Sequence, residues 1–482
     1  MKRLLFFCGI IGIVLLTGFY VYKIMKQPVC KDCNVILISL DTLSANHLPC
    51  YGYERNTAPN LCRFGEENVM FTNMYANAGF TLPSHVSLFT GLLPSQHAVN
   101  FAIKDRLSSK TPFLPEILQK NGYKTYFSMP LHNIHLPVAT VYNRGIDKLV
   151  DGDNPLAWKT SLRALSDNNK KGQKTFLFLH TYWVHDPYIL ENEKKTIYAN
   201  NNDASTYPKT YEEYRACDID FLTFLKKELG NDLTGESRID KEEYPTYKEI
   251  HRQLLTVSDD KSMARFCALY KDSRYLEDYY HVYSYSIVDT KDAKMMDHLK
   301  DLYDSKIVEL DKQLKDVFTY VQNSGLKKNT IIIVTADHGE EFMEHGRWGH
   351  GYNLYDTTVK VPLIMYVPGQ GSKKITQIAQ SVDIVPTLLS MLEIKKPYTF
   401  AGSNLFAKSI SSKTKYEVAQ ELNQNINVDT VRDNEWKLFY QIKDGAPVGV
   451  HLFNYKKDPQ EKNDVIFINP TVVERLLKNI PK

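Results

Sequence analysis

The stretch "NVILISLD" (residues 34–41) is a short run of branched apolar residues that ends in a carboxylate. Continuously apolar runs of this length are typical of parallel strands, which are buried on both faces. Three more runs of the same kind follow, at residues 175–183, 329–339 ("NTIIIVTADHG") and 361–369. Helically spaced apolar residues separate them, most clearly from 297 to 324, with Gly325 at the expected helix end. We therefore predict an α/β fold with a mostly parallel sheet and helices on both faces.

Two regions depart from this alternation. Residues from about 190 to 295 are polar, rich in tyrosine and helical in pattern, which indicates an inserted helical lid. After residue 372 the chain changes to short strand-like pieces and a final helix near 472–479. The predicted organisation is a main domain at 34–372, which carries the insertion, and a small C-terminal α+β subdomain at 373–482.

The N-terminus has a different character. An almost uninterrupted apolar run extends from Leu4 to Tyr22, preceded by Lys2 and Arg3, and it is long enough to cross a bilayer as a helix. No small-residue cleavage pattern follows it, so we predict an uncleaved signal-anchor over residues 1–26, with a removed signal peptide as the alternative. The rest of the chain is then expected outside the cytoplasm, in a periplasm or at a cell surface, on a single-pass membrane protein.

Composition narrows the partners. The 482 residues carry a net charge of +3, and lysines and arginines are scattered along the sequence, so nothing favours nucleic acid as a partner. Six cysteines follow Cys8, an even number that suits an oxidising compartment without fixing the pairing. The motif "CKDC" at residues 30–33 stands alone, and we interpret it as part of a linker.

Potential metal ligands end two of the predicted strands. Asp41 closes the first strand, and Asp337 and His338 close the strand "TIIIVTADHG". Because the carboxyl ends of parallel strands meet at one edge of a sheet, we expect these side chains to converge. Carboxylates with imidazole and no thiolate suit Mn²⁺, Zn²⁺, Mg²⁺ or Ca²⁺.

The stretch "NAGFTLPSHVSLFTGLLPS" (residues 77–95) offers a nucleophile, Thr81, at the start of an apolar helix. One interpretation is that Thr81 only caps this helix, with Pro83 in its first turn. The other is that Thr81 is a further metal ligand, because a divalent ion that lowers the pKa of bound water should activate a bound alcohol as well.

Several histidines lie near or after the ends of predicted strands and could stabilise a tetrahedral anion or protonate a leaving oxygen. They are His132, His180, His185, His345 and His350.

Taken in order, these segments resemble the sulfatase branch of the alkaline phosphatase superfamily. The similar motifs are "NVILISLDTLSANHLPCYGYERNTAPNL", "TLPSH", "HDPY", "TADHGEEF", "GRWGHG", "VKVPLIMYVPG", "SVDIVPTLLSML" and "VRDNEWKLF…HLFNYKKDPQEKND". The resemblance covers residues 34 to about 465, apart from the insertion.

The resemblance implies roles for individual residues. Asp41, Asp337 and His338 resemble the family's metal ligands, and Thr81 stands where sulfatases carry a Cys or Ser that is converted to formylglycine. The other implied residues are His132, His185 and His350 in catalysis, with Ser84 and His85 in substrate binding.

The chain also departs from the family pattern. Thr81 cannot become formylglycine, His85 replaces the signature Arg, and Thr42 replaces the second metal-binding Asp. In addition, Pro130 replaces the Lys of the Lys-x-His element, and His350 falls where many members have a catalytic Lys. An Asp-His pair with a Thr nucleophile is similar to single-metal phosphotransferases and phosphodiesterases of the same superfamily, so we expect one metal ion.

The resulting prediction is a metal-dependent hydrolase of sulfate or phosphate esters, anchored in a membrane and using Thr81 as its nucleophile. One alternative is a phosphotransferase or phosphodiesterase that acts on an envelope lipid or glycan. Another is a catalytically inactive protein that keeps the fold to bind a glycan or a partner.

Overall fold

The structure is a computed structural model that describes residues 28–99, 107–130, 144–152, 154–188, 198, 221–225, 252–254, 256–270, 287–407, 417–420 and 428–480. The chain divides into two compact units. The first holds the described residues up to Thr181, those of Leu314–Glu340 and those from His350 onward. The second holds the described residues of Tyr182–Gln313 and Glu341–Gly349.

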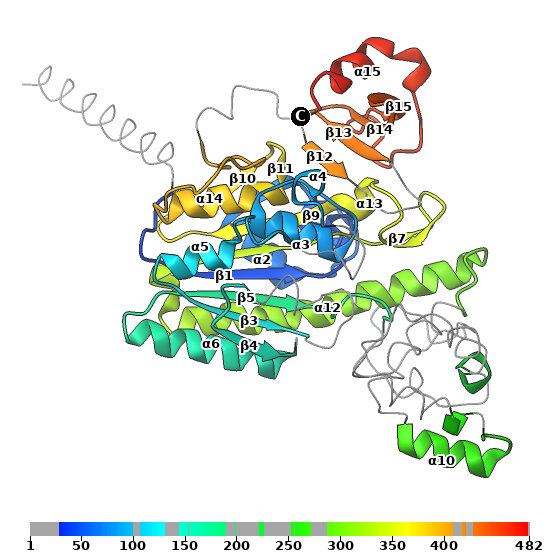
Figure 1. Cartoon of the computed structure of the whole chain (residues 1–482), viewed down its shortest axis with the longest axis horizontal. Helices are drawn as coiled ribbons and strands as arrows, with labels where there is room; N and C mark the ends of the chain where they lie inside the picture. The colour runs from blue at the N-terminus through cyan, green and yellow to red at the C-terminus, as the bar shows by residue number, and fades with distance from the viewer. Residues whose placement is uncertain are drawn as a thin grey trace, which may run out of the picture. The chain divides into compact units, whose positions relative to one another are not determined.

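A mixed, mostly parallel sheet forms the core of the first unit (Figure 1). Within the described residues it has nine strands, in the order β10-β2-β9-β6-β1-β5-β3-β4, and β11 also pairs with β2. Their bounds are β1 Asn34–Leu40, β2 Val69–Tyr75, β3 Lys124–Met129, β4 Lys148–Asp151, β5 Thr175–Thr181, β6 Thr330–Thr335, β9 Lys360–Tyr366, β10 Lys373–Ile375 and β11 Ala379–Gln380. The predicted buried strand at 34–41 is confirmed as β1, which runs parallel to β5 and β6 at the centre of the sheet.

The direction of β9 was predicted wrongly. Its sequence has the same apolar character as the parallel strands, yet β9 is antiparallel to both β2 and β6. An uninterrupted apolar run reports burial on both faces, which any central strand has. It does not indicate strand direction. That direction depends on which end of the neighbouring strands the chain has reached when the new strand begins.

Helices cover both faces of this sheet, as predicted. In Figure 1, α3, α5 and α14 lie on one side of strands β1 and β5, and α6 lies on the other. The helix predicted over 297–324 is α12, and Gly325 follows its end in the left-handed conformation with φ 76°. Among the described residues, the α-helices of the first unit are α2 Pro59–Glu67, α3 Thr81–Thr90, α4 Pro94–His97, α5 Leu114–Lys120, α6 Pro155–Lys170, α13 Asp356–Val359, α14 Ile384–Met391 and α15 Pro470–Leu477. Helix α12 Ala293–Asn323 belongs in part to each unit.

A small antiparallel sheet follows in the first unit. It consists of β12 Glu417–Gln420, β13 Asp429–Arg432, β14 Lys437–Lys443 and β15 Ala446–Phe453. Successive side chains of β14 point to opposite faces of this sheet and pack into two different hydrophobic clusters. Leu438 packs with Leu476 of α15, and Phe439 packs with Tyr75 and Phe453. Strands β10 and β11 pair with β2, so the predicted boundary at residue 373 falls within the large sheet.

The second unit contains the described parts of the helical insertion. Its elements include α10 Asp260–Tyr270, the first part of α12, and the hairpin of β7 Glu341–Phe342 with β8 Trp348–Gly349. Aromatic rings of Tyr188, Tyr303 and Phe342 pack together, and the Lys306 ammonium lies 4.1 Å from the Trp183 ring centroid.

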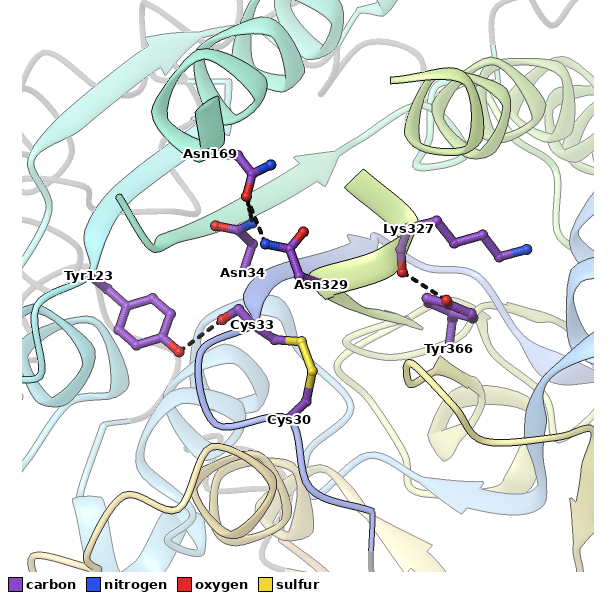
Figure 2. Close-up of a disulfide and its surroundings, with 8 residues drawn as sticks. All are labelled: Cys30, Cys33, Asn34, Tyr123, Asn169, Lys327, Asn329 and Tyr366. Carbon is purple, nitrogen blue, oxygen red and sulfur yellow. Dashed lines mark hydrogen bonds between the residues drawn. A yellow bond between two sulfur atoms is a disulfide. The ribbon is translucent and has the colours of Figure 1, made fainter. Parts of the chain in front are cut away.

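Two disulfides lie in the described residues of the first unit, Cys30–Cys33 and Cys50–Cys62. The "CKDC" motif therefore forms a closed loop directly before β1, and the Tyr123 hydroxyl donates a hydrogen bond to the Cys33 carbonyl (Figure 2). In the part of the chain that the structure describes, no helix is both long and apolar enough to cross a bilayer. The predicted signal-anchor at 1–26 lies outside the described residues.

Candidate active site

The ends of β1 and β6 bring three potential metal ligands together. Asn34 lies opposite Thr330 in the parallel register, so both strands end at the same edge of the sheet. Asp41, Asp337 and His338 follow these ends, and their ligand atoms all lie within 4.8 Å of one another. All three side chains are buried. The sequence-based expectation that they converge is confirmed.

Backbone geometry holds Asp337 in place. Its Oδ1 accepts hydrogen bonds from the backbone N–H of His338 at 2.9 Å and of Thr42 at 3.3 Å. Thr42 has a positive φ of 55°, a conformation that directs its N–H toward this carboxylate and that costs free energy in a β-branched residue. A Cβ on Gly339 would lie 2.3 Å from the Thr357 carbonyl oxygen, so only glycine fits after His338.

Thr81 is the first residue of α3, and its hydroxyl faces this cluster. The Oγ1 atom lies 3.4 Å from Asp41 Oδ2 and 3.1 Å from His338 Nε2. The N-cap of α3 is Phe80, and no side chain caps the helix. The interpretation of Thr81 as a helix cap is therefore wrong, because its oxygen is directed at the carboxylate and imidazole instead.

The tautomer of His338 follows from its other contact. His338 Nδ1 lies 2.9 Å from the Gly339 carbonyl oxygen. Because a carbonyl oxygen only accepts hydrogen bonds, Nδ1 carries a proton and donates. In the neutral ring Nε2 is then the acceptor, and this is the atom that faces the Thr81 hydroxyl.

The two carboxylates differ in their electrostatics. Burial, followed by the nearby charge of Asp337, raises the pKa of Asp41 well above its usual value. Burial opposes ionisation of Asp337 too, but His338, His85 and His180 outweigh it and lower the pKa of Asp337 to about 2. The site therefore holds one firmly ionised carboxylate beside one with a higher proton affinity.

The residues present fit a divalent cation. Asp41 Oδ1 and Asp337 Oδ2 are buried and accept no hydrogen bond from the described residues. Buried carboxylate oxygens without donors are costly, and a cation between them would remove that cost. Two carboxylates and one imidazole form a donor set suited to Mn²⁺ or Zn²⁺, and also to the harder ions Mg²⁺ and Ca²⁺.

Ser84 and His85 support the site from within α3. The Ser84 hydroxyl donates to the Asp337 carbonyl oxygen. His85 Nδ1 lies 3.0 Å from the Thr81 carbonyl oxygen, and Nε2 lies 2.9 Å from Ser39 Oγ. His85 is buried, and burial lowers its pKa despite Asp337 nearby. Both residues therefore contact their neighbours in the fold, and their role in substrate binding stays a prediction.

His180 lies beneath the same cluster, at the end of β5. Its ring packs edge-on against His85 with centroids 4.7 Å apart, and Nδ1 donates to the Ser39 carbonyl oxygen at 3.2 Å. Its Nε2 lies 3.5 Å from Asp41 Oδ2. The sequence marked His180 as a strand-end histidine, but Ser39 was not singled out, because a serine inside an apolar strand carries no chemical signal of its own.

His350 joins the site through Glu340, which sequence reasoning missed. Its Nδ1 lies 3.0 Å from Glu340 Oε1, and its ring centroid lies 4.4 Å from that of His338. Glu340 is buried. The available signal was its place in "TADHGEEF", two residues after His338.

The remaining predicted histidines are not part of this cluster's described geometry. His132 lies outside the described residues. His185 and His345 belong to the second unit. There His185 Nδ1 lies 3.2 Å from Asp186 Oδ1, and His345 Nδ1 lies 3.6 Å from Glu341 Oε2. Their catalytic roles stay predictions.

Comparisons with known proteins find matches over most of the chain. Residues 33–394 match the family model described as Sulfatase, and residues 343–480 match that of N-sulphoglucosamine sulphohydrolase, C-terminal. Human arylsulfatase K is 27% identical over 479 residues, which cover 94% of this chain and 82% of that protein. An N-acetylglucosamine-6-O-sulfatase of Bacteroides thetaiotaomicron is 23% identical over 417 residues, which cover 78% of this chain and 70% of that protein.

The fold also matches solved structures. One of them is described as a complex with its substrate D-glucosamine-2-N,6-O-disulfate. It superposes with a TM-score of 0.62 at 19% identity, over 94% of this chain and 97% of that chain.

Proposed function

Because the chain belongs to the sulfatase family of sulfuric ester hydrolases, we propose that Thr81 is the nucleophile with which it cleaves sulfate esters. The observation that carries the proposal is the position of Thr81 Oγ1, 3.4 Å from Asp41 Oδ2 and 3.1 Å from His338 Nε2. The neighbouring hydroxyl of Ser84 donates to the Asp337 carbonyl and is therefore the weaker candidate.

Activation of Thr81 needs a proton acceptor. Asp41 Oδ2 lies 3.4 Å from the hydroxyl oxygen, within hydrogen-bond reach, and can accept its proton. A divalent ion held by Asp41, Asp337 and His338 would supply further activation, because such ions lower the pKa of hydroxyl groups bound to them. The buried, uncapped N-terminus of α3 favours the negative charge that develops there.

In the proposed first step, Thr81 Oγ1 bonds to the sulfur atom and the sulfur–alkoxide bond breaks. The products are a sulfated Thr81 and the released sugar alcohol. His350, paired with Glu340, is the proposed donor of the proton that the leaving oxygen takes up. Attack by water on the sulfur of sulfated Thr81 then releases sulfate and a proton and restores the hydroxyl.

The proposed substrates are sulfated amino sugars. Support comes from the similar N-acetylglucosamine-6-O-sulfatase and from the similar structure with a disulfated glucosamine. The second family model, named after a sulphoglucosamine hydrolase, covers the C-terminal part of the chain.

We also propose that the enzyme works outside the cytoplasm and is tethered by its N-terminal segment. The apolar run from Leu4 to Tyr22 supports the tether. The disulfides Cys30–Cys33 and Cys50–Cys62 support an oxidising compartment.

Initial rates of the full chain in detergent with Mn²⁺ or Zn²⁺ test the proposal. The substrates are glucosamine 6-sulfate and an aryl sulfate. Thr81→Val keeps the shape but removes the oxygen, and we expect a loss of about 10³-fold or more in kcat. Thr81→Ser keeps the oxygen and should retain most of the rate. Acid quenching during turnover should trap a Thr81 peptide heavier by SO₃. Full activity of Thr81→Val would refute the proposal.

A second candidate function is favoured by Thr81 itself. The residue cannot form formylglycine, and a threonine with an Asp-His metal pair is similar to phosphotransferases and phosphodiesterases of the superfamily. The same assay therefore includes an aryl phosphate monoester and an aryl phosphodiester with the leaving group of the aryl sulfate. A Thr81-dependent rate on either phosphate that exceeds the sulfate rate would favour this candidate.

A further inference from the structure

Lysines that are scattered in the sequence gather at one edge of the large sheet. Strands β1, β3, β5 and β6 are parallel neighbours, so their starts lie at the same edge. An exposed lysine lies within four residues before each start, namely Lys31, Lys120, Lys171 and Lys328. The active-site residues Asp41 and Asp337 follow the strand ends and lie at the opposite edge.

Two more lysines extend this group. Lys110 and Lys395, both exposed, line a surface cavity of about 280 Å³ together with Lys120. The Cys30 N–H donates to the Met391 carbonyl oxygen at 2.7 Å, which places the turn that carries Lys395 beside the entry to β1. We call Lys31, Lys110, Lys120, Lys171, Lys328 and Lys395 the basic edge.

Acidic residues at this edge neutralise other cations. Asp32 pairs with Lys174 at 3.6 Å, Asp147 pairs with Lys124 at 3.3 Å, and Glu116 pairs with Arg144 at 2.6 Å. Glu393 is exposed in the turn before Lys395. Among the described residues, no carboxylate lies within 4 Å of a basic-edge ammonium group, so the edge keeps an excess of positive charge.

The N-terminal segment enters the fold at this same edge. Figure 2 shows the Cys30–Cys33 loop leading into Asn34 beside Asn329 and Lys327, which precede β6. Residues 23–27 alone separate the apolar run ending at Tyr22 from Pro28. Five fully extended residues span at most about 18 Å, so a bilayer that held the run would lie close to the basic edge.

We propose that the basic edge rests on the anionic headgroups of the bilayer that anchors the N-terminal run. This inference relies on the proposed tether and adds an orientation to it. Lysines held within a Debye length of an anionic surface are attracted to it, and six of them around one attachment point restrain rotation of the domain. The catalytic edge then points away from the bilayer, toward substrates in the surrounding medium.

Hydrogen exchange of the full chain in lipid nanodiscs tests this orientation. One disc type contains phosphatidylcholine alone, and the other adds phosphatidylglycerol. We expect amides near residues 119–124 and 325–330 to exchange several-fold more slowly in the anionic discs, with the difference removed by high salt. The triple variant Lys120→Glu, Lys171→Glu, Lys328→Glu should lose this protection while its aryl sulfatase rate stays unchanged.

A matched control reverses the same number of exposed charges elsewhere, at Lys443 at the end of β14 and at Lys456 and Lys457 in the turn after β15. It should keep the lipid-dependent protection. Equal exchange in both disc types would overturn the orientation while leaving the tether intact. Protection by a soluble sulfated polymer, without any lipid effect, would instead assign the edge to an acidic glycan. A chain that fails to enter discs at all would refute the tether and this inference together.

Discussion

The pair of His350 and Glu340 allows the proposed proton donation to the leaving oxygen to be tested with single substitutions. Their contact of 3.0 Å places a buried carboxylate against Nδ1 of His350 and fixes the orientation of its ring. If His350 donates a proton to the leaving oxygen, His350→Gln should slow cleavage of an alkyl sulfate by about 10²–10⁴-fold. An aryl sulfate with a weakly basic leaving group needs no such donor and should lose much less. Comparing kcat for the two substrates measures the difference.

Glu340→Gln serves as the companion variant. It keeps the size and the acceptor oxygen of the side chain but removes its charge. We therefore expect kcat to fall more for the alkyl sulfate than for the aryl sulfate, as in His350→Gln, but by a smaller factor. An equal loss on both substrates would show that His350 maintains the site's structure and donates no proton.

The residue types at the strand ends predicted the metal-ligand cluster. They did not predict the residues that contact and position the histidines around it, such as Glu340 and Ser39. Asp41, Asp337 and His338 converge because parallel neighbours must end at one edge. Thr81 remained ambiguous in sequence because a cap and a nucleophile both stand at a helix start. Glu340 was missed because its partner His350 comes after the β7–β8 hairpin, whose path no local sequence pattern encodes.

At the scale of elements, a buried charge cluster connects α13 to the small sheet. Lys437 of β14 lies 2.9 Å from Asp356 Oδ1 and 2.8 Å from Glu461 Oε1. Arg432 of β13 pairs with Asp356, and its guanidinium carbon lies 3.6 Å from the Tyr75 ring centroid. Removing one partner would leave the others charged and buried without compensation. This costs more stability than replacing the whole cluster with apolar residues of similar volume.

The cluster predicts a pH dependence of stability. Burial disfavours ionisation of Asp356, but Arg432 and Lys437 outweigh it and hold its pKa far below the usual range. Asp356 thus stabilises the fold above its unfolded pKa of about 4, and this stabilisation is lost as the pH falls below that value. Burial and then Asp356 raise the pKa of Glu461, whose contribution has the opposite sign and weakens as the pH rises.

We expect Asp356→Asn to lower the unfolding free energy at neutral pH by about 3–5 kcal/mol. The variant should also show a smaller fall in Tm between about pH 5 and pH 3, because the substituted side chain has no carboxylate that takes up a proton on unfolding. Glu461→Gln, which keeps an acceptor for the Asp356 N–H, is the control and should cost less. Denaturant unfolding followed by near-UV circular dichroism gives both quantities. An unchanged acid slope in Asp356→Asn would contradict this account.

Element types were predictable where a local sequence pattern decides them, and strand direction was not. The strands β1, β5 and β6 follow from their apolar runs, and α12 follows from its helical spacing and Gly325. The reversal of β9 and the pairing of β10 with β2 depend on long-range register. The parallel pairing of β1, β3, β5 and β6 brings together lysines that are dispersed in the sequence.

At the scale of the whole molecule, the tether can be separated from the catalytic fold. If the run from Leu4 to Tyr22 spans a bilayer, an arginine at its centre costs about 3 kcal/mol of insertion free energy, or about 100-fold in partitioning. We therefore expect Ile13→Arg to leave the carbonate-resistant membrane fraction, whereas Ile13→Leu should stay in it. The mass of the N-terminal peptide decides the alternative, because a removed signal peptide would leave a mature chain without the run. Wild-type protein recovered intact from Met1 but soluble in carbonate would contradict the tether, with Thr81-dependent sulfatase activity unaffected by that result.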